Sequence, residues 1–199
     1  MKLDTAIQIN ELDQLSPDRV YTYADYLKWR FKERVELFRG KVMKMSPAPS
    51  LRHQEISFKL SGVLYNNLKD RKCSAFTAPF DVRLTQGSGD ENEIYTVVQP
   101  DLCIICDASK LDQQGCKGVP DLIVEILSHN SAAKDVKEKY DLYEEAGVPE
   151  YWIIHPDEKL LEIFVLENDK YVHTGWHSDQ EVVNSLVIKD LSIDLKEVL

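Results

Sequence analysis

The stretch from Leu122 to Leu127 constrains the fold most, because it is almost wholly apolar and favours β structure, yet contains Glu125. A near-continuous apolar run of this kind is typical of a strand buried on both faces of a sheet. An ionised carboxylate without a partner in such an interior costs several kcal/mol. Glu125 must therefore be neutral, pair with a cation or face an opening, and each outcome bears on function.

Residue periodicity predicts the elements around this strand. Helices are expected over 21–31, 51–69 and 131–146, and a tight hairpin over 35–45 that turns at Arg39-Gly40. Strands are expected over 74–84, 97–106, 121–127 and 151–172, the last interrupted by two turns, and a short edge element over 190–199. Because several strands follow one another before the helix over 131–146, the order predicts a mixed sheet with helices on both faces.

The length and charge of the chain limit its class. Its 199 residues suffice for one domain, expected to span 1–199 with a loosely held segment over 1–20. A net charge of −10 argues against binding nucleic acid through bulk charge, although a local basic cleft is compatible with it. No apolar run reaches the roughly 20 residues of a membrane helix, and the first residues lack a signal-peptide segment. We therefore expect a cytoplasmic protein with no membrane contact.

Cysteine and histidine pairs raise two metal-site alternatives. Cys103 and Cys106 form a C-x-x-C motif, but an odd offset in an expected strand places the two side chains on opposite faces. A zinc site would need a second such motif, which the sequence lacks. His173 and His177 have helical ligand spacing, but the HTGWH stretch that contains them reads as a turn. The sequence therefore favours structural roles for these residues.

Asp101 is a second carboxylate that can meet Glu125. It follows Pro100 near the start of an expected strand and lies 24 positions before Glu125, enough for their strands to be neighbours. Two converging carboxylates cannot both ionise cheaply without a cation between them, and Mg²⁺ accepts such oxygen ligands. Lys139, in the helix over 131–146, can lay its stem on apolar surface and bring its ammonium to the carboxylates. The sequence therefore allows a divalent-metal site at the ends of two strands.

Each of these residues also has a structural alternative. Glu125 could pair with a structural Lys or Arg, and Lys139 could pair with Asp135 on the exposed side of its helix. His53 lies in the first turn of the second expected helix, where a structural histidine agrees with the pattern as well as a site residue does. The spacing alone favours a structural role for Glu36, which lies in the first hairpin.

Four motifs together carry a resemblance to a known family. They are QPDL at 99–102, PDLIVEILS at 120–128, D-x-x-x-K-x-x-x-Y at 135–143 and GVPEYWII at 147–154. Upstream, ELFRGKVMKMSPAPSLRHQEI resembles the family's N-terminal signature, including Glu36, Gly40, Ser46-Pro47 and His53. In order and spacing, the chain from about residue 20 to about residue 170 resembles the Uma-two family of restriction-endonuclease-like proteins, within the PD-(D/E)XK nuclease superfamily.

The resemblance implies an α/β fold with α+β character. The expected architecture is a restriction-endonuclease-like mixed central sheet flanked by helices, with an N-terminal helix-hairpin extension and a nuclease core over about 50–166. The lysine of the family motif would fall at position 127, where this chain has Leu. In this family the following helix supplies that lysine, which makes Lys139 the match. The chain also departs from the family at His155-Pro156, where Asp-Pro is usual.

The expected function is that of a metal-dependent endonuclease acting on DNA. Asp101, Glu125 and the carbonyl of Ile126 would hold Mg²⁺ or Mn²⁺, and Lys139 would orient the attacking water or neutralise developing charge. The further catalytic candidates, from family positions, are Glu36 and His53. The candidate phosphate contacts are Arg52, Lys59 and Lys134. A homodimer is expected for an enzyme that cuts two strands.

Two other classes of function remain open at this point. A catalytically silent module of the same fold, binding nucleic acid or a protein partner, agrees with the acidic net charge. In a glycosidase built on two carboxylates, the distance between the carboxylates would be diagnostic. Nothing in the sequence indicates a surface that binds a sugar. A silent module should bind without metal-dependent cleavage, and a glycosidase should need no metal.

Overall fold

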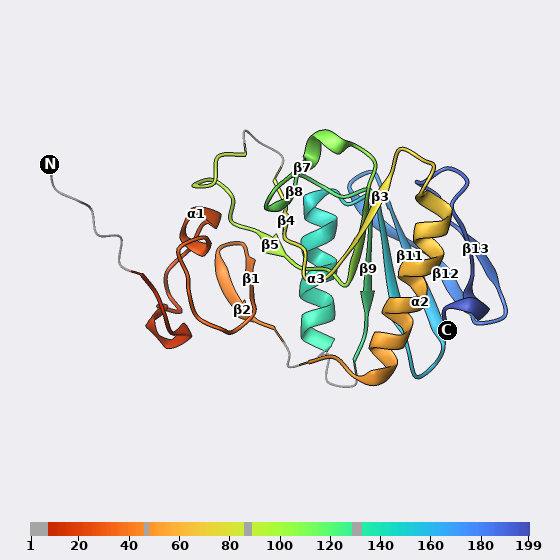
Figure 1. Cartoon of the computed structure of the whole chain (residues 1–199), viewed down its shortest axis with the longest axis horizontal. Helices are drawn as coiled ribbons and strands as arrows, with labels where there is room; N and C mark the ends of the chain where they lie inside the picture. The colour runs from red at the N-terminus through yellow and green to blue at the C-terminus, as the bar shows by residue number, and fades with distance from the viewer. Residues whose placement is uncertain (1–7, 46–47, 86–88, 129–132) are drawn as a thin grey trace, which may run out of the picture.

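The computed structural model describes residues 8–45, 48–85, 89–128 and 133–199, and only the backbone of residues 133–135. Within these residues the chain forms two six-stranded sheets and a two-stranded sheet (Figure 1). The α-helices are α1 (Tyr23–Tyr26), α2 (Leu51–Leu68) and α3 (Ala133–Ala146), and 3-10 turns cover Leu12–Gln14, Ala108–Lys110 and Leu195–Glu197. No helix of the described residues is both long enough and apolar enough to cross a bilayer.

The main sheet has the strand order β12-β11-β10-β9-β6-β3. Its strands are β3 (Ser74–Thr77), β6 (Leu102–Ile105), β9 (Leu122–Ile126), β10 (Glu150–His155), β11 (Leu160–Glu167) and β12 (Lys170–Ser178). β9 and β10 pair in parallel, whereas the other neighbouring strands of this sheet pair antiparallel. The sheet is therefore mixed, as predicted, and α3 is the crossover that joins its parallel pair.

The second sheet has the strand order β2-β1-β5-β4-β8-β7. Its strands are β1 (Val35–Phe38), β2 (Lys41–Lys44), β4 (Val82–Arg83), β5 (Val97–Val98), β7 (Leu111–Asp112) and β8 (Gly115–Lys117). The predicted hairpin is present, and its turn residues Arg39 and Gly40 have φ of 49° and 78°. The two-stranded sheet joins β13 (Val182–Asn184) to β14 (Ser192–Asp194), which is the edge element expected near the C-terminus.

Helices α2 and α3 cover opposite faces of the main sheet, with β9 between them in Figure 1. The buried apolar side chains of α2 are Ile56, Leu60, Leu64 and Leu68. They pack with Leu122 and Val124, while Ile123 packs on the other face with Leu142 and Tyr143 of α3. Because successive strand residues point to opposite faces, Glu125 lies on the α3 face.

Local signals fix the ends of both helices. The Ser50 hydroxyl accepts a hydrogen bond of 3.2 Å from the His53 amide, so it caps α2 as predicted. α3 ends at Gly147, whose φ is 84°, and the Val148 amide donates to the Tyr143 carbonyl at 3.0 Å. This Schellman arrangement stops the helix one residue before the chain turns toward β10.

The helix predicted over 21–31 is wrong beyond its first turn. Thr22 caps it as expected, but the regular helix covers only Tyr23–Tyr26. Trp29 instead forms an isolated parallel bridge with Ile9, and the Arg30 amide donates to the Ile9 carbonyl at 2.8 Å. A contact with a distant segment therefore overrides the local periodicity. The same bridge holds Ile9, within the segment expected to be loose; residues 1–7 lie outside the described residues.

Two predicted strands each prove to be two strands in different sheets. The stretch 74–84 divides into β3 and β4, and 97–106 divides into β5 and β6. Pro79 and Pro100 lie in the two breaks. Proline cannot donate to a strand ladder, so each proline ends one pairing and lets the chain cross to the other sheet.

The stretch 173–177 was also wrongly predicted, since it lies inside β12 and is not a turn. His173 contacts Glu162 at 3.5 Å, whereas His177 contacts Glu181 at 3.1 Å. Strand spacing separates the two rings, so they do not form a common ligand pair.

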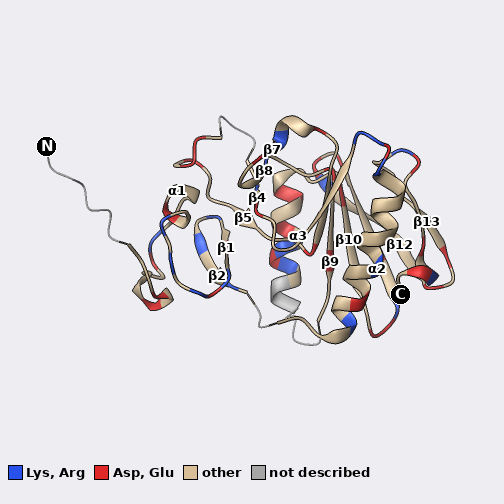
Figure 2. Cartoon of the chain, viewed as in Figure 1, with Lys and Arg blue, Asp and Glu red and all other residues tan. Residues whose placement is uncertain are grey.

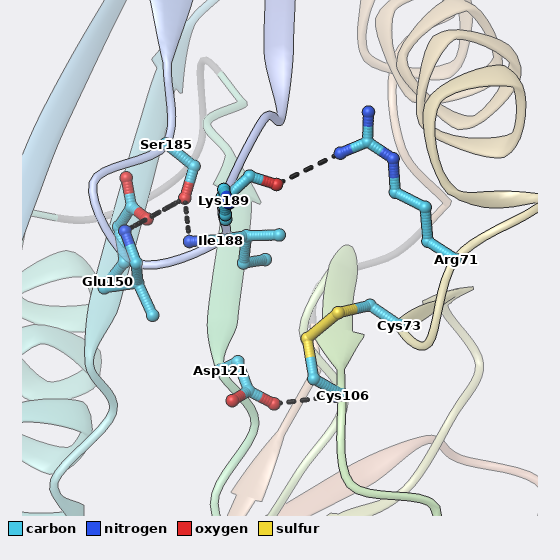
Figure 3. The surroundings of a disulfide bond; sticks show 9 residues. Arg71, Cys73, Cys106, Asp121, Glu150, Ser185, Ile188 and Lys189 are labelled. Atoms are coloured by element: carbon cyan, nitrogen blue, oxygen red, sulfur yellow. Dashed lines mark hydrogen bonds between the residues drawn. A yellow bond between two sulfur atoms is a disulfide. The ribbon is translucent and has the colours of Figure 1, made fainter.

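Cys73 and Cys106 form a disulfide that the sequence analysis did not predict (Figure 3). Cys106 packs on the α2 face and Cys103 on the α3 face, so the expected placement on opposite faces is correct. Cys103 and Cys116 are free and buried. Disulfides are uncommon in the cytosol, so the expected cytoplasmic location stays a prediction that this bond does not favour.

Candidate active site

The structure brings the five candidate residues together from five separate elements. Glu36 comes from β1, His53 from the first turn of α2, Glu125 from β9 and Lys139 from α3, while Asp101 directly precedes β6. We call these five residues the carboxylate cluster. It lies where β9 ends, beside the N-terminal end of α2.

Glu125 is held by two donors from α3. The Lys139 ammonium lies 2.8 Å from its Oε1, and the Tyr143 hydroxyl donates to the same oxygen at 2.7 Å. The spacing of 139 and 143 places both donors on one face of the helix. Lys139 also lies 3.6 Å from Oε1 of Glu36, which is 5% exposed. One buried ammonium therefore serves two buried carboxylates.

The single positive charge of Lys139 does not compensate all the negative charge of the carboxylates around it. Burial raises the pKa of Glu125 to about 7; Lys139 lowers it, and the charges of Asp101 and Glu36 raise it. Burial lowers the pKa of Lys139, but Glu125 and Glu36 outweigh it and raise that pKa above its ordinary value. Lys139 thus stays protonated at neutral pH, while Glu125 is divided between its two forms.

Asp101 is oriented by a side chain and a backbone amide. Its Oδ2 lies 3.1 Å from Nε2 of His53 and accepts a hydrogen bond of 2.8 Å from the Ile126 amide. Burial lowers the pKa of His53, but the hydrogen bond and charge of Asp101 outweigh burial and raise it. The other ring nitrogen, Nδ1, is buried and has no hydrogen-bond partner among the described residues.

The donor set fits a hard divalent cation with few protein ligands. In a strand, the amide and carbonyl of one residue point to the same side, so we expect the Ile126 carbonyl on the same side of β9 as its amide, which donates to Asp101. Two carboxylates and one carbonyl are oxygen ligands of the kind that Mg²⁺ binds together with waters and phosphate oxygens. Among the described residues no group of three or more His, Cys, Asp and Glu side chains could hold a metal. A closed site built from side chains alone is therefore not what these residues offer.

A second layer of polar residues supports Glu36 and was missed in the sequence. The Gln99 amide donates to Oε1 of Glu36 at 2.8 Å, and its side chain donates to Asp81 at 2.7 Å. Burial raises the pKa of Asp81, and hydrogen bonds from Gln99 and Tyr26 lower it. Asp81 stands in the apolar stretch SAFTAPFDVRL. Like Glu125, Asp81 is a carboxylate within an apolar run, and this signal in the sequence could have identified it.

Other sequence candidates lie elsewhere. Arg52 donates to the Leu199 carbonyl at 2.7 Å and lies 3.6 Å from Glu55, so it is engaged away from the cluster. Lys59 lies on the solvent side of α2. The side chains of Lys134 and Asp135 lie outside the described residues. Lys139 reaches Glu125, so its alternative as a purely exposed helical residue is wrong.

Comparison with known proteins identifies the family of the chain and proteins that are similar to it. A family model described as "Uma2: Putative restriction endonuclease" matches residues 23–196. The uncharacterized protein slr1290 of Synechocystis sp. is 29% identical over 132 residues, which make up 65% of this chain and 62% of that protein. The match thus spans less than two thirds of the relative.

A solved structure has the same fold. It is the crystal structure of "a putative nuclease belonging to DUF820" from Anabaena variabilis ATCC 29413, with a TM-score of 0.67 and 19% identity. The superposition covers 89% of this chain and 96% of that chain. At this level of identity the similarity establishes the architecture, and the chemistry has to be argued from the carboxylate cluster.

Proposed function

The chain belongs to the Uma2 family, which carries the description "Putative restriction endonuclease", and on this premise we propose that it is a metal-dependent endonuclease hydrolysing phosphodiester bonds in DNA. One observation carries the proposal: Lys139 lies 2.8 Å from Glu125, beside Asp101, although it comes from α3 and not from β9. Two acids and a lysine, the residue types that the resemblance to the superfamily implies, thus lie together in space although Leu occupies position 127 in sequence, and this supports the proposal.

The proposed roles follow from the contacts. Asp101, Glu125 and the Ile126 carbonyl would hold Mg²⁺ or Mn²⁺, and His53 and the Ile126 amide keep Asp101 oriented. A bound divalent ion supplies charge for the scissile phosphate and lowers the pKa of a coordinated water.

Lys139 supplies the second positive charge of the site. Glu36 holds its ammonium near the reaction centre, and Tyr143 fixes the carboxylate that this ammonium meets. From this position Lys139 would orient the attacking water or stabilise charge that develops on the phosphate.

The test is cleavage of supercoiled plasmid with Mg²⁺, with Mn²⁺ and with EDTA. Glu125→Gln and Asp101→Asn should abolish cleavage, and circular dichroism should show them folded. Glu167→Gln is the matched control, because Glu167 is an exposed carboxylate at the opposite end of β11 from the cluster. Cleavage that resists EDTA, or that survives in Glu125→Gln, contradicts the proposal.

The alternative function is a silent module that binds nucleic acid or a protein partner. The observation that favours it is the close Lys139–Glu125 pair, which neutralises Glu125 without any metal. Calorimetric titration of Mn²⁺ separates the two functions. Heat of binding that disappears in both folded variants supports the nuclease, and no binding even with DNA present supports the module.

We also propose that two copies of the chain pair through α2. Leu51, Phe58 and Tyr65 follow one another at seven-residue intervals on its solvent side and are 77%, 83% and 68% exposed. Gly62 lies between Phe58 and Tyr65, and a Cβ there would meet nothing within 4 Å. The helix therefore presents an apolar stripe with a gap that a second helix can approach closely.

The charged residues on this face of α2 can pair with the charged residues of the same face on a second copy. Glu55 and Lys69 each lie seven residues from Gly62, on either side of it. In an antiparallel pair with the two Gly62 residues facing each other, Glu55 meets Lys69 of the second copy, and the reverse contact repeats it. Phe58 then meets Tyr65 of the second copy.

Sedimentation velocity at micromolar concentration tests the dimer. The wild type should sediment as a dimer and Phe58→Asp as a folded monomer. Tyr95→Asp is the control, since Tyr95 is 45% exposed and lies beside the turn of the first hairpin, where its carbonyl accepts a hydrogen bond from the Gly40 amide. A monomeric wild type at tens of micromolar refutes the pairing and leaves the nuclease proposal standing.

A further inference from the structure

One segment of this acidic chain, residues 28–44, has a clear excess of positive charge, and we call it the basic arm. The arm contains seven Lys and Arg against two Glu, a net charge of +5. The remaining chain has 17 Lys and Arg against 32 Asp and Glu, a net charge of −15. The separation of charge along the chain is therefore much larger than the overall −10 suggests.

All seven cations of the arm are exposed, while one of its two acids is turned inward. They are Lys28, Arg30, Lys32, Arg34, Arg39, Lys41 and Lys44. Glu36 is buried in the carboxylate cluster, 3.6 Å from Lys139, so it does not offset the charge of the arm at the surface. Figure 2 shows the blue residues of the arm along β2 and on the chain leading into β1, beside α3.

Several of these cations have partners that leave their charge uncompensated. Arg30 donates to the carbonyls of Leu27 and Trp29 at 2.8 Å, and Lys41 donates to carbonyls of the segment 17–19. Carbonyl groups are neutral and orient a cation without cancelling it. Arg39 is different, because it forms an ion pair with Glu145 at 2.6 Å. The available charge therefore lies toward the open end of the hairpin, away from Arg39.

The open end of the hairpin adjoins the carboxylate cluster. Arg34 donates to the Gln99 side chain at 2.6 Å, and the Gln99 amide donates to Glu36 at 2.8 Å. Arg34 is two strand positions from Glu36, which is about 7 Å along a strand. Lys44 lies across from Val35, next to Arg34, because the Met45 amide donates to the Arg34 carbonyl at 3.0 Å.

We propose that the basic arm binds the phosphate backbone of duplex DNA and positions the strand at the carboxylate cluster, with Arg30, Lys32, Arg34 and Lys44 as contacts. The inference rests on the proposed nuclease function. A net −15 body and a cluster of three carboxylates repel a polyanion, so a local positive surface has to bring the phosphates in. Such contacts fix the position of the duplex and do not read its sequence.

The arm adds a second set of candidate phosphate contacts to Arg52, Lys59 and Lys134, which stay predictions from the sequence. Lys59 lies on the solvent side of α2 and Arg52 is engaged with Leu199, whereas the arm carries its cations beside the cluster. The hairpin thus has two functions on its two sides: β1 sends a carboxylate inward, and the exposed side carries the cations.

The experiment measures binding, with EDTA present, of a fluorescent 20-base-pair duplex at several salt concentrations. Lys32→Gln/Lys44→Gln is the test variant, because neither side chain has an ion pair among the described residues. Removing two phosphate contacts should lower the slope of log affinity against log salt by roughly 2 and weaken binding by about 10- to 100-fold at 0.1 M salt.

Lys72→Gln/Lys189→Gln is the matched control, with the same change in net charge. Lys72 follows the C-terminal end of α2, and the Lys189 carbonyl accepts a hydrogen bond from Arg71 there (Figure 3). Leu68, at this end of α2, comes 15 residues after His53, so the end lies about 22 Å from His53. The control should leave the salt slope of the wild type unchanged.

Each outcome decides something. An equal loss in both double variants would show that net charge alone matters and would overturn the proposal, as would a wild type that does not bind the duplex at low salt. A loss confined to the arm variant supports it, whether or not cleavage is observed. Binding through the arm without metal-dependent cleavage would reject the proposed nuclease function and retain the arm.

Discussion

Glu125 and Glu150 are buried carboxylates on neighbouring parallel strands, and they are stabilised in opposite ways. Glu150, with 0% exposure, meets neutral donors: the Trp152 ring nitrogen at 2.8 Å, the amides of Leu186 and Val187, and the Ser185 hydroxyl (Figure 3). Glu125 meets a cation that it shares with Glu36, and it has Asp101 as a like-charged neighbour.

The difference teaches that a buried carboxylate is not by itself a functional site. Around Glu150 each oxygen is matched by donors that come from one short turn, so the group anchors the segment 185–188 to β10. Around Glu125 three carboxylates compete for Lys139 and His53. The excess of negative charge, and not the burial, is what a bound cation would relieve.

The largest expected effect is on the cleavage rate, which should depend on Glu125 and not on Glu150. Glu125→Gln should lower the cleavage rate by about 10³-fold or more, about 4 kcal/mol in transition-state stabilisation, because a neutral amide binds a divalent ion much more weakly than a carboxylate does. The rate of plasmid nicking with Mg²⁺ measures this. A variant that keeps more than a tenth of the wild-type rate would show that Glu125 is as structural as Glu150.

The next effect separates them by stability. Glu150→Ala should lower the free energy of unfolding by about 3 kcal/mol, since it leaves several buried donors without an acceptor. Urea unfolding measures it, and Glu167→Ala, an exposed change, should stay within about 0.5 kcal/mol. The folded fraction of Glu150→Ala should cleave at the wild-type rate; a loss of activity per folded molecule would place Glu150 in the reaction.

A third effect concerns pH. Glu125 has a folded pKa of about 7 against an ordinary 4.5, so between these values the folded chain binds the extra proton. The contribution of Glu125 to stability is therefore greatest below pH 4.5 and falls as pH rises toward 7, by up to about 1.4 kcal/mol per pH unit. Urea unfolding across this range should show this slope in the wild type and not in Glu125→Gln. Parallel curves for the two proteins would contradict the proposed state of Glu125.

The smallest effect tests the hydroxyl of Tyr143. Tyr143→Phe removes one hydrogen bond to the charged form of Glu125, which should cost about 1 kcal/mol of stability at pH 8. Because the lost bond favoured the carboxylate, the pH midpoint of Mn²⁺ binding should also move upward. An unchanged midpoint, measured by calorimetry at successive pH values, would mean that the Tyr143 hydroxyl does not favour the carboxylate form of Glu125.

Local patterns predicted the parts of the fold whose signals lie within one element. The apolar run of β9, the Ser50 cap and stripe of α2, and the glycine that ends α3 are each visible in about 20 residues of sequence. The bridge between Trp29 and Ile9 and the passage of chain between sheets at Pro79 and Pro100 were missed, because they depend on distant partners.

The candidate site was predictable to the same extent. The apolar neighbours of Glu125 made it identifiable from sequence, and the motifs indicated Asp101, Glu36, His53 and Lys139. Their meeting point was not visible in any one segment. Gln99, which links Glu36 to Asp81, was missed because its backbone amide makes the key contact, and any residue type carries that group.

The position of Lys139 on α3 also affects the order in which the protein folds. Glu36 and its lysine lie 103 positions apart, so their contact closes only after most of the chain is available. Contacts between such distant residues form slowly, because the intervening chain must first lose its freedom. A nascent chain that has reached Leu127 holds all three carboxylates and no lysine to join them. The cluster can thus be completed only once α3 has been synthesised, and three strands of the main sheet, β10, β11 and β12, still follow α3 in the chain.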